Sequence, residues 1–223
     1  MTVVSAMRTL RVTVYLLGLL LFGAGCKTTY YQAWEKLGKH KRDLLKENVE
    51  QARDDQANAA QTFKDALTRL KELYRFEGGN LEKTYDKLKS DYDRCQARAD
   101  TVKSRIAKVQ EIASDLFQEW EAEIKTMENS NLASSSRQTL RETQSKFQSL
   151  QAAMKQAERS MEPVLRQFRD QVTYLKHNLN AQAVGALKGE ALDIEKEVQQ
   201  LIRDMNASIS EADSFIRGMQ TTS

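Results

Sequence analysis

Apolar residues recur at alternating steps of three and four positions along most of this 223-residue chain. Such spacing places them on one stripe of an α-helix, and its continuation over many turns is the signature of coiled-coil packing. In the third stretch, for example, the row contains Phe147, Leu150, Met154, Ala157, Met161, Val164 and Phe168. Four such rows, of which the first is the weakest, predict four long helices over about residues 32–76, 81–128, 134–178 and 182–219.

Three short breaks separate the rows. Gly78-Gly79-Asn80 ends the first, since glycine readily adopts the left-handed conformation at a helix C-terminus. The segment Asn129–Ser136 separates the second and third rows, and its serines are good N-caps. Asn178-Leu179-Asn180 is the third and softest break. Because the helices have similar lengths, we expect an all-α, elongated, antiparallel four-helix bundle of coiled-coil type, with helices roughly 70 Å long.

Pro163 lies inside the third row, where proline removes one helical hydrogen bond. The heptad phase continues from Met161 through Val164 to Phe168, which predicts a kink rather than a reversal of the chain. The alternative is a break at Pro163, followed by one very long last helix.

The amino terminus has the pattern of an export signal. Arg8 and Arg11 precede an apolar run over residues 12–22, and the small residues Gly23, Ala24 and Gly25 follow. The run is shorter than the roughly 20 apolar residues that a membrane-spanning helix needs. Translation could begin at Met1 or at Met7, since either start leaves a complete signal.

Residues 23–26 resemble the lipobox of bacterial lipoproteins, in which a small residue precedes the cysteine that receives the lipid. Ala24, Gly25 and Cys26 match it, whereas Gly23 replaces the leucine common at that position. The resemblance implies a signal peptide over 1–25, a diacylglyceryl thioether on Cys26 with acylation (as by palmitate) of the new amino group, a tether over 26–31 and a helical bundle over 32–220. The alternative is an ordinary signal peptide that a cysteine happens to follow. By analogy with enterobacterial sorting, Lys27 directs the protein to the periplasmic face of the outer membrane.

Composition narrows the functional classes. Charged residues make up 29% of the chain, and there are only 9 glycines and a single proline, as in long helices. Two of the 34 basic residues and none of the 31 acidic ones lie in the first 25 residues, so the remaining chain has a net charge of +1. The signs are interleaved, which argues against nucleic acid as a partner.

The chain offers little catalytic chemistry. We find no nucleotide-binding loop, serine elbow, Cys-His cluster or Glu-x-x-His motif, so we expect no enzyme, cofactor or metal site. His40 and His177 fall at opposite ends of the predicted bundle and cannot share a metal, and each is expected to be a surface or cap residue.

Cys95 occupies a heptad position level with Phe63, Phe168 and Leu192 in the antiparallel bundle. It is the one cysteine left if Cys26 carries lipid, so it could be a redox-active thiol or form an intermolecular disulfide. We prefer a small core residue.

Trp34 and Trp120 are predicted at the membrane end of the bundle. They could anchor in the lipid interface, although a tryptophan pair that closes the core is the preferred interpretation.

Four stretches carry a wider resemblance: residues 35–43, 76–82, 161–165 and 175–181. As a set they are similar to the bacterial family of domain of unknown function 2959, over essentially all of residues 28–217. That resemblance implies a helical lipoprotein and supplies no activity.

Two of these stretches meet at the far end of the predicted bundle. A partner-binding tip is our hypothesis for the residues gathered there, which are Arg75, Glu77, Asn80, Lys176, His177, Asn178 and Asn180. The alternative is that they only cap tight turns. We therefore predict a lipid-anchored, non-enzymatic spacer or adaptor that binds an envelope protein. The alternative function is a self-assembling or membrane-shaping coiled coil that lies along the bilayer, and the oligomeric state stays open.

Overall fold

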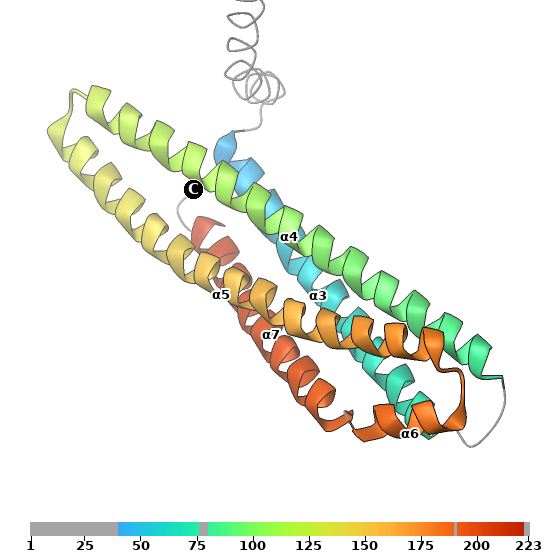
Figure 1. The fold of residues 1–223 in the computed structure, drawn as a ribbon. Helices are drawn as coiled ribbons and strands as arrows, with labels where there is room; N and C mark the ends of the chain where they lie inside the picture. The colour runs from blue at the N-terminus through green and yellow to red at the C-terminus, as the bar shows by residue number, and fades with distance from the viewer. Residues whose placement is uncertain (1–39, 76–79, 190, 221–223) are drawn as a thin grey trace, which may run out of the picture. The chain divides into compact units, whose positions relative to one another are not determined.

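The computed structural model describes residues 40–75, 80–189 and 191–220, and in these residues it contains helices and no strand (Figure 1). The helices are α3 (Lys41–Tyr74), α4 (Leu81–Thr126), α5 (Ser130–His177), α6 (Ala181–Gly189) and α7 (Ala191–Gln220). The all-α class predicted from the heptad rows is confirmed. The predicted signal peptide, Cys26, its tether and Trp34 lie outside the described residues.

The chain divides into two units, residues 1–44 and 45–223. Of the first unit, the structure describes only the start of α3. There the backbone N–H groups of Asp43 and Leu44 donate to the His40 carbonyl, and the His40 N–H donates to an Asp43 carboxylate oxygen over 3.3 Å. His40 is therefore a cap residue, and this exchange is one half of a capping box.

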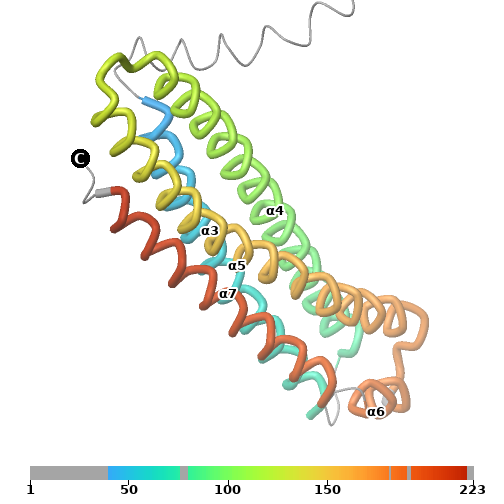
Figure 2. Tube along the Cα trace, turned by 90° about the vertical axis from the view of Figure 1, so that its left-hand side faces the viewer, coloured from blue at the N-terminus to red at the C-terminus, as the bar shows by residue number. Residues whose placement is uncertain are grey.

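In the second unit, α3, α4, α5 and α7 run side by side, each antiparallel to the next (Figures 1 and 2). Ion pairs join α3 to both of its neighbours: Asp55 binds Arg105 of α4 over 3.0 Å, and Arg53 binds Asp213 of α7 over 3.0 Å. Across the core, the rings of Phe63 in α3 and Phe168 in α5 stack with centroids 6.5 Å apart. This is the expected antiparallel four-helix bundle.

The heptad rows form the core. Among the largest fully buried side chains are Phe63, Leu70, Ile106, Leu150, Met154, Phe168, Ile194 and Leu201. Fully burying one such side chain contributes on the order of 1.5–3 kcal/mol, so the rows supply the main drive for helix association. Gln56 and Ser208 also lie in the core, and Gln56 Oε1 and Ser208 Oγ have no hydrogen-bond partner among the described residues.

Helix α5 continues through Pro163 without a break, so the alternative of a chain reversal at that residue is wrong. The axis of α5 changes direction between its gold and orange parts (Figure 1). Proline has no N–H to donate to the carbonyl of Arg159, four residues earlier, and its ring crowds that carbonyl. The bend is therefore a local consequence of one residue in an otherwise regular helix.

The prediction of one helix over 182–219 is wrong, because this stretch forms α6 and then α7. Glycine is a poor helix former, and Gly185 and Gly189 weaken the helix where it changes direction. Figure 2 shows α6 nearly end-on while the long helices run along the bundle, so α6 lies across the end of the bundle. It buries Ala183, Val184 and Leu187 there.

The turn between α4 and α5 is tighter than predicted. Helix α5 begins at Ser130, four residues earlier than expected, because Asn129 rather than a serine is the N-cap. Its side-chain oxygen accepts hydrogen bonds from the backbone N–H groups of Asn131 and Leu132, over 3.0 and 3.1 Å.

Candidate functional site

The distal end is the end of the bundle at which α3 and α5 finish and α6 lies. The Tyr74 hydroxyl donates a 3.0 Å hydrogen bond to Oε1 of the buried Gln171, which joins the last turns of α3 and α5. The described members of the predicted tip all lie at this end, as the chain path in Figure 1 shows. Glu77 lies outside the described residues.

Three asparagines of the predicted tip act as caps. The side-chain oxygen of Asn80 accepts from the Lys83 N–H at the start of α4, and that of Asn180 accepts from the Ala183 N–H at the start of α6, each over 2.9 Å. The Asn178 side chain donates to the Tyr174 carbonyl at the end of α5. Their side chains form hydrogen bonds with backbone groups that are otherwise unpaired at helix ends. For these three positions, this agrees with the alternative that the tip residues cap turns.

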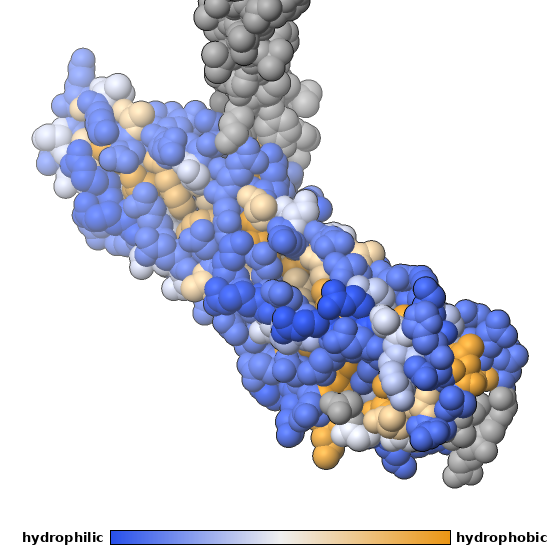
Figure 3. Space-filling model, in the orientation of Figure 1, coloured by the Kyte–Doolittle hydropathy of each residue, from blue (hydrophilic) through white to orange (hydrophobic). Residues whose placement is uncertain are grey.

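The cationic members of the tip remain available to a partner. Arg75, Lys176 and His177 are exposed and have no ion pair or side-chain hydrogen bond in the described part of the chain. Large apolar side chains are exposed at the same end, namely Tyr174, Leu179 and Leu192. Figure 3 shows hydrophobic surface at the end of the bundle where α6 lies. A surface of this kind can bind apolar and acidic groups together.

The apolar part of this surface was not expected from the sequence. Leu179 continues the third heptad row, and Leu192 was predicted level with Cys95. Both are exposed, Leu192 by 70%, whereas Ile194, a position of the fourth heptad row, is buried as that row predicts. Leu179 follows the end of α5 at His177, so its apolar row no longer belongs to a helix that faces the core.

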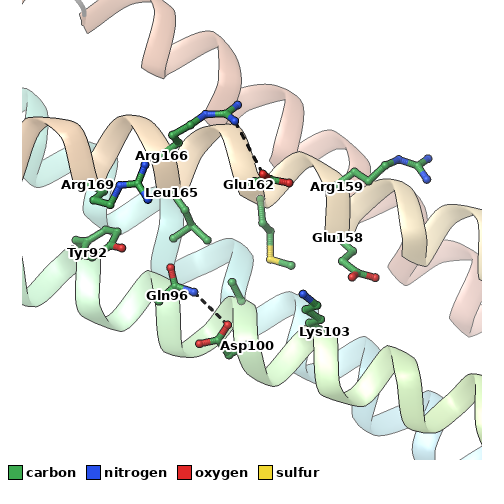
Figure 4. Close-up of a pocket in the computed structure, with 12 residues that line it drawn as sticks. Tyr92, Gln96, Asp100, Lys103, Glu158, Arg159, Glu162, Leu165, Arg166 and Arg169 are labelled. Atoms are coloured by element: carbon green, nitrogen blue, oxygen red, sulfur yellow. Dashed lines mark hydrogen bonds and ion pairs between the residues drawn. The ribbon is translucent and has the colours of Figure 1, made fainter.

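A groove of about 390 Å³ lies between α4 and α5, next to the bend at Pro163. Its lining includes the core residues Ala99 and Met161 and the partly buried Leu165, and Leu165 points toward α4 (Figure 4). The lining positions extend over twelve residues on each helix, or about 16 Å from the first to the last. The groove is therefore long enough for a chain segment.

Charged groups form the rims of this α4–α5 groove. Lys103 and Glu158 face each other across one part of it, and Arg169 lies beside Tyr92 at another (Figure 4). Two acids of the rims already have partners. Glu158 forms an ion pair with Lys155 over 2.8 Å, and Asp100 accepts a hydrogen bond from the Gln96 amide over 3.1 Å. Lys103 and the Tyr92 hydroxyl have no such partner in the described residues, so the free binding capacity is cationic and phenolic. The sequence could not reveal the groove, because its width depends on the separation of two helices.

Asp91 is a buried carboxylate that sequence reasoning missed. Only 2% of the residue is exposed, and its two oxygens accept hydrogen bonds from Arg69 of α3 and Arg94 of α4. The hydrogen bond to Asp91 raises the pKa of the Arg69 guanidinium above its usual value. Arg69 lies on α3 and Asp91 on α4, so the ion pair links the two helices. Both guanidinium groups still reach solvent. We therefore interpret the site as structural.

Cys95 is fully buried, as the core interpretation predicts. Its thiol donates to the Thr62 carbonyl of α3 over 3.8 Å, and it forms no disulfide. Burial, with a smaller contribution from the negative charge of Asp91, raises the pKa of the thiol to about 12. The thiolate is the nucleophile in redox chemistry, so Cys95 has the environment of an inert core thiol.

Trp120 closes a small apolar cluster at the end of the bundle opposite α6. It packs with Phe117 against Ile124, Ala133 and Leu140, and its indole N–H donates to the Ser136 hydroxyl over 2.9 Å. The interpretation of Trp120 as a residue that closes the core is supported.

Among the residues that the structure describes, no group of three or more His, Cys, Asp or Glu side chains is arranged to hold a metal ion. None of the described helices has an apolar stretch that is long enough to cross a membrane.

Together the fold and its surfaces define an all-α four-helix bundle with two candidate docking surfaces, the distal end and the α4–α5 groove. The chain belongs to the family described as protein of unknown function (DUF2959), whose model matches residues 30–219. This confirms the resemblance noted in the four sequence stretches. No curated protein and no solved structure matches the chain significantly.

Proposed function

We propose that this chain is a lipid-anchored, non-enzymatic spacer or adaptor of the bacterial cell envelope, and that its distal end binds a protein partner. The anchor in this proposal is Cys26, at the periplasmic face of the outer membrane. A binding role is supported by two kinds of exposed side chain at the same end of the bundle. These are cations without a partner among the described residues and large apolar groups, namely Arg75, Lys176 and His177 together with Tyr174, Leu179 and Leu192.

Exposed apolar groups of this size favour a protein partner. Scattered single apolar residues are normal on a surface, but several at one end, with cations beside them, are typical of an interaction site. The long helices supply the spacer, since the 46 residues of α4 span about 69 Å. The α4–α5 groove is the second candidate surface for the same role.

The anchor and the partner need separate experiments. Growth with labelled palmitate tests the anchor: the wild-type chain should incorporate the label, whereas Cys26→Ser should not. Absence of label in the wild-type chain would contradict the lipid anchor alone, whatever the partner result.

For the partner, a photo-crosslinking amino acid at position 176 should give a discrete protein adduct in intact cells. The same residue at position 64, an exposed lysine in the middle of α3, is the matched control and should give none. Changing Lys176→Ala and His177→Ala together should abolish an adduct formed from a crosslinker at position 179, with helicity unchanged by circular dichroism. An unchanged adduct in the double variant would contradict the distal end as the binding surface.

The alternative, a membrane-shaping coiled coil, requires contact along a flank of the bundle. Position 98, exposed near the middle of α4, would then crosslink to lipid or to a second copy of the chain, whereas position 176 would give no separate partner.

A further inference from the structure

Helices α4 and α5 extend beyond the other helices of the second unit at the end opposite α6 (Figures 1 and 2). Because Asp55 pairs with Arg105 in antiparallel helices, Leu45 lies level with about residue 115. Ser160 binds Asp204, so the end of α7 lies level with about residue 144 by the same geometry. Residues 116–143 therefore form a projecting α4–α5 hairpin.

The hairpin has its own packing. Ile124 of α4 packs with Ala133 and Leu140 of α5, and Phe117 and Trp120 complete the cluster. The Asn129 cap and the hydrogen bond from the Met127 N–H to the Ile124 carbonyl close the turn. The turn is thus held in one conformation before any partner binds.

Two large apolar side chains flank this ordered turn and do not join the cluster. Met127 is 41% exposed and Leu132 is 63% exposed. They are the exposed large hydrophobic residues at this end of the described chain, and the turn between them carries only one charged side chain, Glu128. Such a turn can place both side chains in an apolar medium without burying a cation or an unsatisfied helix end.

We propose that the α4–α5 turn is a second membrane contact, in which Leu132 and Met127 enter the surface of a zwitterionic phospholipid layer. The inference rests on the proposed function, because lipid on Cys26 would keep the chain at a bilayer. Only 18 residues lie between Cys26 and Leu45, so the two can be at most about 65 Å apart. The hairpin projects at the end of the bundle where Leu45 lies, so a tether of this length lets the hairpin reach the bilayer that carries the anchor.

Charge selects the type of lipid. The hairpin contains five acids and three bases: Glu119, Glu121, Glu123, Glu128 and Glu142 against Lys125, Arg137 and Arg141. An anionic surface would repel this net negative charge within a Debye length, about 8 Å at physiological ionic strength. A zwitterionic surface would not, so insertion depends on the apolar pair. The tether makes a weak contact sufficient, since it raises the effective concentration of the turn at the bilayer.

The test compares two exposed leucines at opposite ends of the bundle. Leu132→Cys and Leu192→Cys are each labelled with the fluorophore NBD, and the buried Cys95 thiol should stay unlabelled. The acylated chain is placed on phosphatidylcholine vesicles. At position 132 we expect a several-fold rise in fluorescence, a blue shift, and quenching by a spin-labelled lipid. Position 192 should remain as in water.

Two results would overturn the proposal. If position 132 stays in water like position 192, the turn does not enter lipid; if both enter lipid, the bundle lies along the bilayer. A second arm carries Cys26→Ser and a polyhistidine tag in place of residues 1–25, bound to vesicles with a chelating lipid. Since this arm needs no acylation, failure at position 132 here contradicts the membrane contact, whereas missing palmitate in cells contradicts only the anchor.

Discussion

The Cys95 thiol should react with a disulfide reagent far more slowly in the folded protein than in the unfolded chain. The perturbation is unfolding itself, in a Cys26→Ser chain that keeps one of the two cysteines of the sequence. In the folded protein Cys95 is fully buried between α3 and α4, beside the Thr62 carbonyl. A reagent can reach it only when these helices separate locally.

The magnitude follows from the thiolate population. Burial raises the pKa of the thiol from 9.0 to about 12. At pH 8 the thiolate fraction then falls from about one in ten to about one in ten thousand, since only the thiolate attacks. In the closed structure, protonation alone would slow the reaction about 1000-fold. A reaction through local opening is slowed instead by the free energy needed to separate the helices. A solvent-facing redox thiol would show neither effect.

Absorbance of released thionitrobenzoate at pH 8 measures the rate, with the urea-unfolded chain as the reference. A folded rate within tenfold of the unfolded rate would refute the reasoning and restore the redox interpretation. The stability should also depend on pH. The folded state binds the thiol proton more tightly than the unfolded chain, so its contribution is complete below pH 9 and is lost as pH rises toward 12. The loss is up to about 1.4 kcal/mol per pH unit, and Cys95→Ala should remove this component.

Three substitutions test the packing by urea unfolding. Asp91→Asn should lower the free energy of unfolding by about 1–3 kcal/mol, because the amide has no charge and only one acceptor oxygen for the two arginines. Asp93→Asn, two residues away and 53% exposed, is the control and should change it by less than about 0.5 kcal/mol. Ser208→Ala should raise it by about 1 kcal/mol, since the hydroxyl is buried without a partner, and a decrease would mean that a partner exists. Gly185→Ala should raise it by about 0.5–1 kcal/mol, because no atom lies within 4 Å of the added Cβ; a loss of stability would show that α6 needs glycine there.

The long-range packing could be predicted because a helix has a constant rise. Antiparallel helices of equal rise put Phe63 level with Phe168, and the two rings do stack. Likewise the uninterrupted heptad phase at Pro163 predicted a continuous helix, since loss of one hydrogen bond is small beside the burial of Met161, Val164 and Phe168.

The prediction of a single helix over 182–219 was wrong because Leu187 has two possible burial sites, one along the bundle and one across its end. Leu187 keeps the heptad phase of the fourth row, so the row looked unbroken. The structure instead buries Leu187 with Ala183 and Val184 across the end of the bundle, and weak helix propensity at Gly185 and Gly189 permits the change of direction. Periodicity cannot reveal this choice, because the alternative burial site exists only after the other helices have assembled.

The candidate surfaces were predictable only in part. The positions of Arg75, Lys176 and His177 followed from the lengths of the helices. The exposure of Leu192, the α4–α5 groove and the burial of Asp91 did not, since each depends on the distance between neighbouring helices. Asp91 is one of 31 acidic residues, and no spacing distinguishes it from the rest.

Asp91 also bears on how the chain finds one alignment among many. A heptad pattern is nearly unchanged when one helix slides by seven residues past another, so apolar rows alone permit several alignments of comparable energy. In a shifted alignment Arg69 would move about 10 Å along the axis, and the buried Asp91 carboxylate would lose its α3 partner. The buried charge adds little net stability, but it penalises those shifted alignments that separate Asp91 from Arg69.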